Sequence, residues 1–107
     1  MGFFKKSFQK NVTRDNEFLK DYAVKCNGLE LYVQENEKVL KELKALKDDF
    51  QYTVATDVRA AKAVEKNFKA DFEALTAHLQ QTEWDEAQAL LLIRGIRRYI
   101  VEISSMR

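Results

Sequence analysis

The sequence predicts an all-α fold, a long-helix antiparallel bundle that we expect to be completed by homodimerisation. The chain has 107 residues, of which 46% are hydrophobic and 33% charged, with no proline and three glycines. It is therefore too apolar for a disordered chain and too poor in turn-forming residues for a β fold. Large apolar residues recur at steps of three and four, with strong helix formers between them, which is typical of amphipathic helices.

The first element is the segment 1–14, in which three phenylalanines stand among four basic residues without any acidic one. If this segment is helical, Phe4, Phe8 and Val12 form one apolar ridge that lysines flank. The pattern is typical of a helix lying in the plane of a membrane interface, where lysines attract anionic lipid headgroups. The alternative is that Phe4 and Phe8 extend the core of the following helix, and the sequence leaves both interpretations open.

The second element is a long helix over about 16–80. It is predicted from an apolar stripe that runs from Phe18 to Leu79, in which Gly28 is the only soft spot. Paired aspartates and β-branched residues lower the helix propensity over 48–56. The sequence leaves open whether the helix kinks or breaks there.

The last element is a helix over about 83–106, which begins at a capping-box sequence from Thr82 to Asp85. Its apolar residues span a wide arc, so it must be buried on more than one side, and one long partner helix cannot cover so much surface. We therefore expect a second copy of the chain to complete the bundle. Trp84 is expected to close one end of the core, and the two helices together form a single domain over 15–107.

The two ends of the chain are basic and the middle is acidic. Residues 1–14 carry a net charge of +4, residues 15–87 a net charge of −6, and residues 88–107 a net charge of +3. The total of +1 argues against a nucleic-acid partner held by phosphate contacts. Three arginines cluster in the last helix, namely Arg94, Arg97 and Arg98. Either anionic lipid headgroups or acidic groups of a neighbouring helix offset their mutual repulsion.

The sequence predicts no catalytic site, no cofactor and no metal site. His78 is the only histidine, and its spacing from Glu73 and Asp71 does not match that of helical metal ligands, so we expect a surface or boundary histidine. Cys26 lies on the apolar stripe, and we expect a small buried residue in a reducing compartment. The longest apolar run, residues 89–93, is too short to span a membrane.

The segment GFFKKSFQKNVTR, the capped junction after it and the spaced apolar residues of the long helix resemble a BAR domain of the amphiphysin type with its N-terminal helix. The spaced residues are Phe18, Tyr22, Leu29, Leu40, Leu43, Leu46 and Phe50. The resemblance covers about residues 2–75 and implies a dimer of long, kinked helices, whose basic face meets anionic membrane and whose N-terminal helix inserts as a wedge. The lipid-binding residues predicted from this resemblance and from the arginine cluster are Phe3, Phe4, Lys5, Lys6, Phe8, Lys10, Val12, Arg14, Arg94, Arg97 and Arg98.

The predicted function is that of a non-enzymatic, cytoplasmic, peripheral membrane protein that binds or curves anionic membranes as a homodimer. The alternative is a scaffold or oligomerisation module that binds helical protein partners. That alternative predicts a three-helix bundle resembling a spectrin-type repeat, with breaks near 48–56 and near Gln80.

Overall fold

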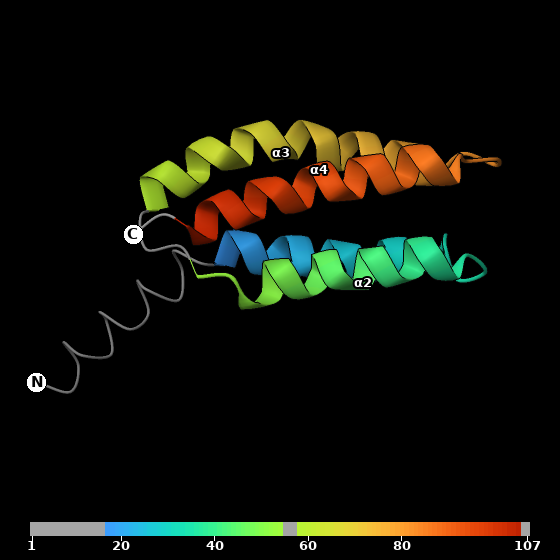
Figure 1. Ribbon diagram of the computed structural model, residues 1–107, viewed down its shortest axis with the longest axis horizontal. Helices are drawn as coiled ribbons and strands as arrows, with labels where there is room; N and C mark the ends of the chain where they lie inside the picture. Colours follow the sequence, from blue (N-terminus) through green and yellow to red (C-terminus); the bar gives the residue numbers. More distant parts are fainter. Residues whose placement is uncertain (1–16, 55–57, 106–107) are drawn as a thin grey trace, which may run out of the picture.

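The computed structural model describes residues 17–54 and 58–105, and these residues form a four-helix bundle (Figure 1). The helices are residues 17–30, α2 (Glu37–Tyr52), α3 (Val58–Leu79) and α4 (Glu86–Ser104). The described residues contain only helices and the turns that join them. The predicted all-α class is therefore confirmed.

The bundle consists of two helical hairpins packed as two layers, and successive helices run in opposite directions (Figure 1). Helix 17–30 and α2 form one layer, and α3 and α4 form the other. Helix α4 packs against both α3 and α2, whereas helix 17–30 lies against α3 through the ring of Tyr22. Both hairpin turns, 31–36 and 80–85, lie at the same end of the bundle, and residue 17 lies at the opposite end.

The predicted long helix over 16–80 is wrong, because the chain turns back twice within that range. After helix 17–30, the amide of Tyr32 donates to the carbonyl of Leu29, an i to i−3 bond that tightens and ends the helix. The side chain of Asn36 then accepts from the amide of Val39 at 3.0 Å and caps the start of α2.

The second interruption lies within 48–56, where the sequence left a kink or a break open. Helix α2 ends at Tyr52, and Thr53 adopts an extended conformation with φ −77° and ψ 131°. A helix of the predicted length could not bury its apolar stripe within one chain, whereas the folded-back segments turn their stripes towards each other.

The last helix begins three residues later than predicted, at Glu86, and ends at Ser104. Asp85 is its N-cap, because the Asp85 carboxylate accepts from the amide of Gln88 at 3.0 Å. Thr82, the predicted cap, is exposed in the turn instead. Trp84 packs against the edge of the core, as expected, and this contact places the residue after it where the helix can start.

Aromatic rings from three helices meet at the centre of the core. The ring centroid of Tyr22 lies 5.2 Å from that of Phe50 in α2, 5.1 Å from that of Phe68 and 5.2 Å from that of Phe72, both in α3. Helices α2 and α3 lie diagonally across the bundle, and their rings Phe50 and Phe68 are 5.6 Å apart. The cluster therefore joins the two hairpins.

The inner part of the apolar arc of the last helix is covered within a single chain, whereas Leu91, on the outer part, is 66% exposed. The buried residues on this arc face α2 and α3, and they are Ala89, Ile93, Ile96, Ile100 and Ile103. The chain itself supplies two partner helices for this inner part, where the sequence-based expectation assumed one long helix. Homodimerisation itself stays a prediction.

Candidate lipid-binding surface

Most of the predicted lipid-binding residues lie outside the part of the chain that the structure describes. These are Phe3, Phe4, Lys5, Lys6, Phe8, Lys10, Val12 and Arg14. The choice between a membrane wedge and a backward extension of the core therefore stays open. The described candidates are the three arginines of α4, and the structure gives them different surroundings.

Arg97 is held by acidic residues of α2. Its Nε lies 2.7 Å from Oδ2 of Asp49, and its Nη1 lies 3.4 Å from Oε2 of Glu42. The hydrogen bond that Arg97 donates to Asp49 raises the pKa of Arg97 above its ordinary value. The second of the two explanations for the arginine cluster thus applies to this residue, and Arg97 packs α4 onto α2 rather than facing outwards.

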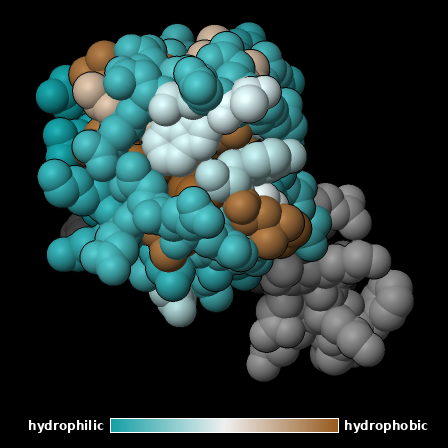
Figure 2. Space-filling model, turned by 90° about the vertical axis from the view of Figure 1, so that its right-hand side faces the viewer, coloured by the Kyte–Doolittle hydropathy of each residue, from teal (hydrophilic) through white to brown (hydrophobic). Residues whose placement is uncertain are grey.

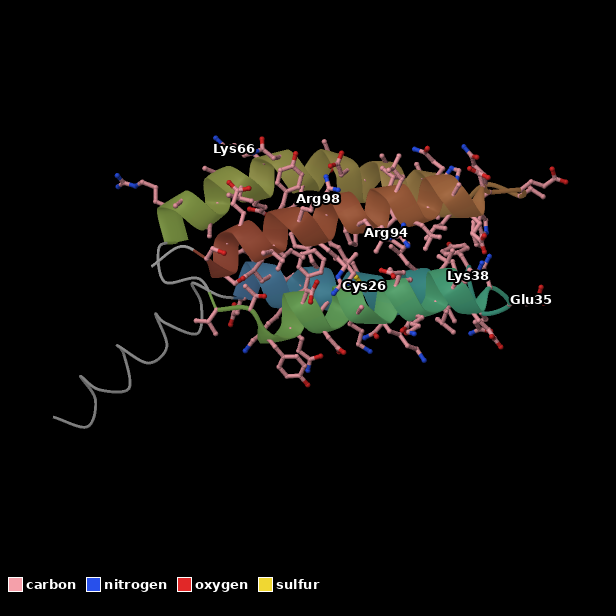
Figure 3. All side chains as sticks on the ribbon, in the orientation of Figure 1. Cys26, Glu35, Lys38, Lys66, Arg94 and Arg98 are labelled. Carbon is pink, nitrogen blue, oxygen red and sulfur yellow. The ribbon has the colours of Figure 1, made fainter. Side chains whose placement is uncertain are left out.

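Arg94 and Arg98 are exposed, and neither forms an ion pair with a described residue (Figure 3). They share the outward face of α4 with two aliphatic side chains, Leu91 and Val101, which are 66% and 60% exposed. Cations between exposed aliphatic residues suit an interface where charge meets lipid headgroups and methyl groups meet the acyl boundary.

A second row of cations follows the outward face of α3, and it is not among the site residues predicted from the sequence. Its members are exposed and spaced at i, i+3, i+7 and i+10, and they are Arg59, Lys62, Lys66 and Lys69. The acidic residue within this stretch, Glu65, is half-buried, and its Oε2 accepts the hydroxyl of Tyr22 at 3.0 Å. The spacing of the four cations is the signal by which the row could have been predicted from the sequence. The net charge of −6 over 15–87 gives no sign of it, because that value averages over the acidic residues of the other elements.

Both rows belong to the layer formed by α3 and α4 (Figure 3), but they lie towards different sides of it. Glu65, which flanks the α3 row, bonds to Tyr22 of helix 17–30, whereas Arg97, beside Arg94 and Arg98, pairs with α2. We call the six cations Arg59, Lys62, Lys66, Lys69, Arg94 and Arg98 the α3–α4 basic surface. The exposed carboxylates that α3 and α4 contribute are Glu73 and Glu102. Exposed cations thus outnumber exposed carboxylates on these helices, although the described chain as a whole is acidic.

His78 and Cys26, whose side chains could in principle act in catalysis or bind a metal, have structural roles. Nε2 of His78 accepts from the amide of Asp85 at 3.0 Å, so the predicted boundary histidine fixes the turn between α3 and α4. Cys26 is fully buried as predicted, and burial raises the pKa of its thiol to about 12. Within residues 17–54 and 58–105, no group of three or more His, Cys, Asp or Glu side chains could hold a metal ion.

No helix in the described part of the chain is long and apolar enough to cross a membrane.

Comparisons with protein-family models, with curated proteins and with solved structures found no match to this chain. Its function must therefore be argued from its own surfaces.

Proposed function

We infer that the chain is a non-enzymatic, peripheral protein that binds anionic membrane surfaces through the α3–α4 basic surface, with residues 1–14 as a second contact. The observation that supports this proposal is the row of exposed cations on α3, in which the neighbouring Glu65 carboxylate is already bonded to Tyr22. On the solvent-exposed face of a helix, cations are usually paired with acidic side chains one turn away. Here the one acidic residue between Arg59 and Lys69, Glu65, bonds to Tyr22, and none of the four cations forms an ion pair with a described residue.

The geometry suits a bundle that lies with its long axis along the membrane. The row on α3 starts at the end of the bundle where residue 17 lies, so the basic segment 1–14 joins the described chain close to it (Figure 1). Each basic residue near an anionic surface contributes about 1 kcal/mol. The cations of the row that meets the membrane add such contributions, which suits reversible recruitment. Salt weakens the attraction because it is electrostatic.

The cytoplasmic leaflet is the expected target, because anionic lipids concentrate there. The BAR-like form of the proposal adds a second copy of the chain, so that two basic surfaces meet one membrane and bend it. This form depends on homodimerisation, which is a separate proposal.

Vesicle flotation tests the role of the basic surface. In the double variant Lys62→Glu with Lys66→Glu, two contacts of about 1 kcal/mol each become repulsive, so partitioning onto phosphatidylserine-rich vesicles should fall by roughly thirtyfold or more. The matched control reverses two exposed lysines on α2, Lys41→Glu with Lys44→Glu. It should change partitioning by less than threefold. Equal losses in both variants, or no flotation of the wild type, would refute the proposal.

A second arm of the same experiment addresses the segment 1–14. The variants Phe4→Glu and Phe8→Glu should weaken flotation without removing it, because the cations of α3 and α4 remain. If these variants bind like the wild type, the wedge is excluded while the basic surface stands.

The scaffold alternative is favoured by one different observation, the exposed apolar residues at the turns. Leu31 is 71% exposed and Tyr32 is 47% exposed. The three-helix form of that alternative is wrong, because the described residues already form four helices. The end of the bundle that carries these residues is a candidate protein contact.

A further inference from the structure

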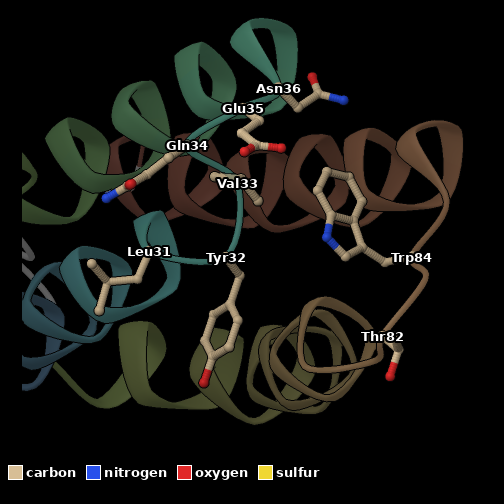
Figure 4. A pocket seen from close by; sticks show the side chains of 8 residues that line it. All are labelled: Leu31, Tyr32, Val33, Gln34, Glu35, Asn36, Thr82 and Trp84. Carbon is tan, nitrogen blue, oxygen red and sulfur yellow. The ribbon is translucent and has the colours of Figure 1, made fainter.

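A hollow of about 510 Å³ lies between the two hairpin turns, at the end of the bundle opposite residue 17 (Figure 4). Its floor is the buried side chain of Val33, and the indole of Trp84 stands as one wall. Leu31 and Tyr32 line its open side. Figure 2 looks onto this end, where white and brown surface at the centre is surrounded by hydrophilic surface.

The walls of the hollow combine aromatic rings with hydrogen-bonding groups. The Glu35 side chain reaches across the hollow towards Trp84, and the indole nitrogen faces the side where Tyr32 lies (Figure 4). The indole N–H of Trp84 has no hydrogen-bond partner among the described residues. A ligand with cationic and aromatic side chains fits such walls, because ammonium groups pair with carboxylates and are attracted to aromatic faces, and rings stack on rings.

This end of the bundle is strongly acidic. Over residues 30–38 and 78–86, the only lysine or arginine is Lys38. The carboxylates in these two stretches are Glu30, Glu35, Glu37, Glu83, Asp85 and Glu86. The hollow therefore lies within a negative field that attracts a basic partner.

We propose that this hollow binds the basic aromatic segment 2–10 of a second copy of the chain, and so joins copies head to tail. The segment GFFKKSFQK carries three phenylalanines and three lysines and no acidic residue, which complements both the apolar walls and the acidic rim. Since the segment joins the bundle at one end and the hollow lies at the other, each copy offers both halves of the contact. Such a heterologous contact does not close on itself, so it produces open chains of copies.

A second copy is a better occupant than the segment of the same chain. Helix α3, with 22 residues, spans about 33 Å, so an intramolecular contact would require the segment to run extended along nearly the whole bundle. Such an arrangement orders many more residues than a contact in which only the segment itself is held.

The test measures the mass of the full chain by sedimentation velocity across a hundredfold range of concentration, without lipid. The wild type should form species larger than a monomer as concentration rises. The variant Leu31→Lys with Glu35→Lys should weaken this association at least tenfold. The matched control is Val24→Lys with Asp48→Lys, which makes the same change of net charge at exposed positions outside the hollow and should associate like the wild type.

Mixing two variants tests the head-to-tail arrangement and guards against misfolding. The hollow variant retains its segment, and the segment variant Phe4→Glu with Lys5→Glu retains its hollow. Neither should associate alone, but a mixture should form a one-to-one heterodimer that grows no further. A wild-type mass that does not depend on concentration, or a mixture that stays monomeric, overturns the proposal.

A spectroscopic measurement locates the contact. Trp84 is the only tryptophan, so its fluorescence reports on the hollow. A synthetic peptide with the sequence of residues 1–14 should shift this emission saturably in the full chain, and the same peptide with its three lysines replaced by glutamate should not. Equal responses to both peptides, or to neither, would contradict binding in the hollow.

Discussion

The three arginines of α4 lie within five residues of one another, yet they have two different roles. Arg97 bonds to Asp49 and Glu42 of α2, whereas Arg94 and Arg98 are exposed on the outward face. Positions three or four apart on a helix share a face only approximately, so Arg97 reaches the carboxylates of α2 while its neighbours do not. Only the position of α2 distinguishes them.

Replacing Arg97 by glutamine should lower the free energy of unfolding by about 1 kcal/mol, because two ion pairs at a partly exposed site are lost. The side chain of Arg97 is 37% exposed, so solvent screening keeps the effect modest. Urea denaturation measures it. Arg94→Gln is the control and should leave the urea midpoint unchanged. Equal losses of stability in both variants would contradict a stabilising role of the ion pairs of Arg97.

Cys26 should make the stability of the protein depend on pH in the alkaline range. Burial, followed by the nearby charge of Glu30, raises the pKa of the folded thiol from 9.0 to about 12. A raised pKa gives stability that is complete below pH 9 and is lost as pH rises towards 12, at up to about 1.4 kcal/mol per pH unit.

The comparison of Cys26→Ala with the wild type isolates this contribution. The free energy of unfolding of the variant, measured by urea at several values between pH 8 and 10, should fall less steeply than that of the wild type. The pKa of Tyr22 is also raised, by burial and by its bond to Glu65. Because Tyr22 is present in both proteins, its contribution to the pH dependence is the same in both. Identical slopes would contradict the prediction.

At the scale of the elements, the starts of α2 and α4 each depend on a short polar side chain that caps the helix. The sequence identified candidate caps but not which candidate is used. Thr82 and Asp85 both fit the position of a cap, and the choice between them depends on where the chain leaves the turn. The amide of Asp85 donates to Nε2 of His78, and Trp84 packs on the core. These contacts hold the turn so that the Asp85 carboxylate reaches the amide of Gln88.

The capping assignment predicts a difference between two alanine variants. Asp85→Ala should lower the free energy of unfolding by about 1 kcal/mol, because the amide of Gln88 loses its acceptor at the start of α4. Thr82→Ala should have little effect, since Thr82 is exposed in the turn. Thermal denaturation followed by circular dichroism measures both, and a larger loss in the threonine variant would restore the capping box predicted from the sequence.

Helical structure could be predicted from the sequence, whereas the turn at 31–36 could not. Residues such as Val39, Leu43 and Leu46 lie on the predicted stripe and are fully buried, because amphipathic periodicity is a local property. The stripe also continues through 31–36 without a proline. The signal for the turn was Asn36 followed by Glu37, a good cap with an acidic residue in the first turn, but a cap shows where a helix can start rather than where one must end.

For the molecule as a whole, the aromatic cluster makes the two hairpins one cooperative unit. Tyr22 and Phe50 belong to the first hairpin, and Phe68 and Phe72 belong to the second. Neither hairpin can bury its apolar faces alone, so we expect both to unfold in a single transition.

Truncating the cluster should destabilise the entire bundle. Phe50→Ala removes a fully buried ring and should lower the free energy of unfolding by about 3–5 kcal/mol. Tyr52→Ala, two residues further on, removes a ring that is 73% exposed and should change it by less than about 0.5 kcal/mol. Calorimetry should show one transition in each protein, and two separate transitions would mean that the hairpins are independent.

The sequence by itself determined the all-α class, the apolar faces of the helices and the basic character of both ends, because these properties depend on composition and on spacing over one or two turns. The tertiary structure alone decided where the chain turns back, which cations stay unpaired, and that a hollow lies between two turns nearly fifty residues apart. Those features depend on which helices meet, and distant segments meet only where burying their apolar faces together outweighs the entropy of closing the chain between them.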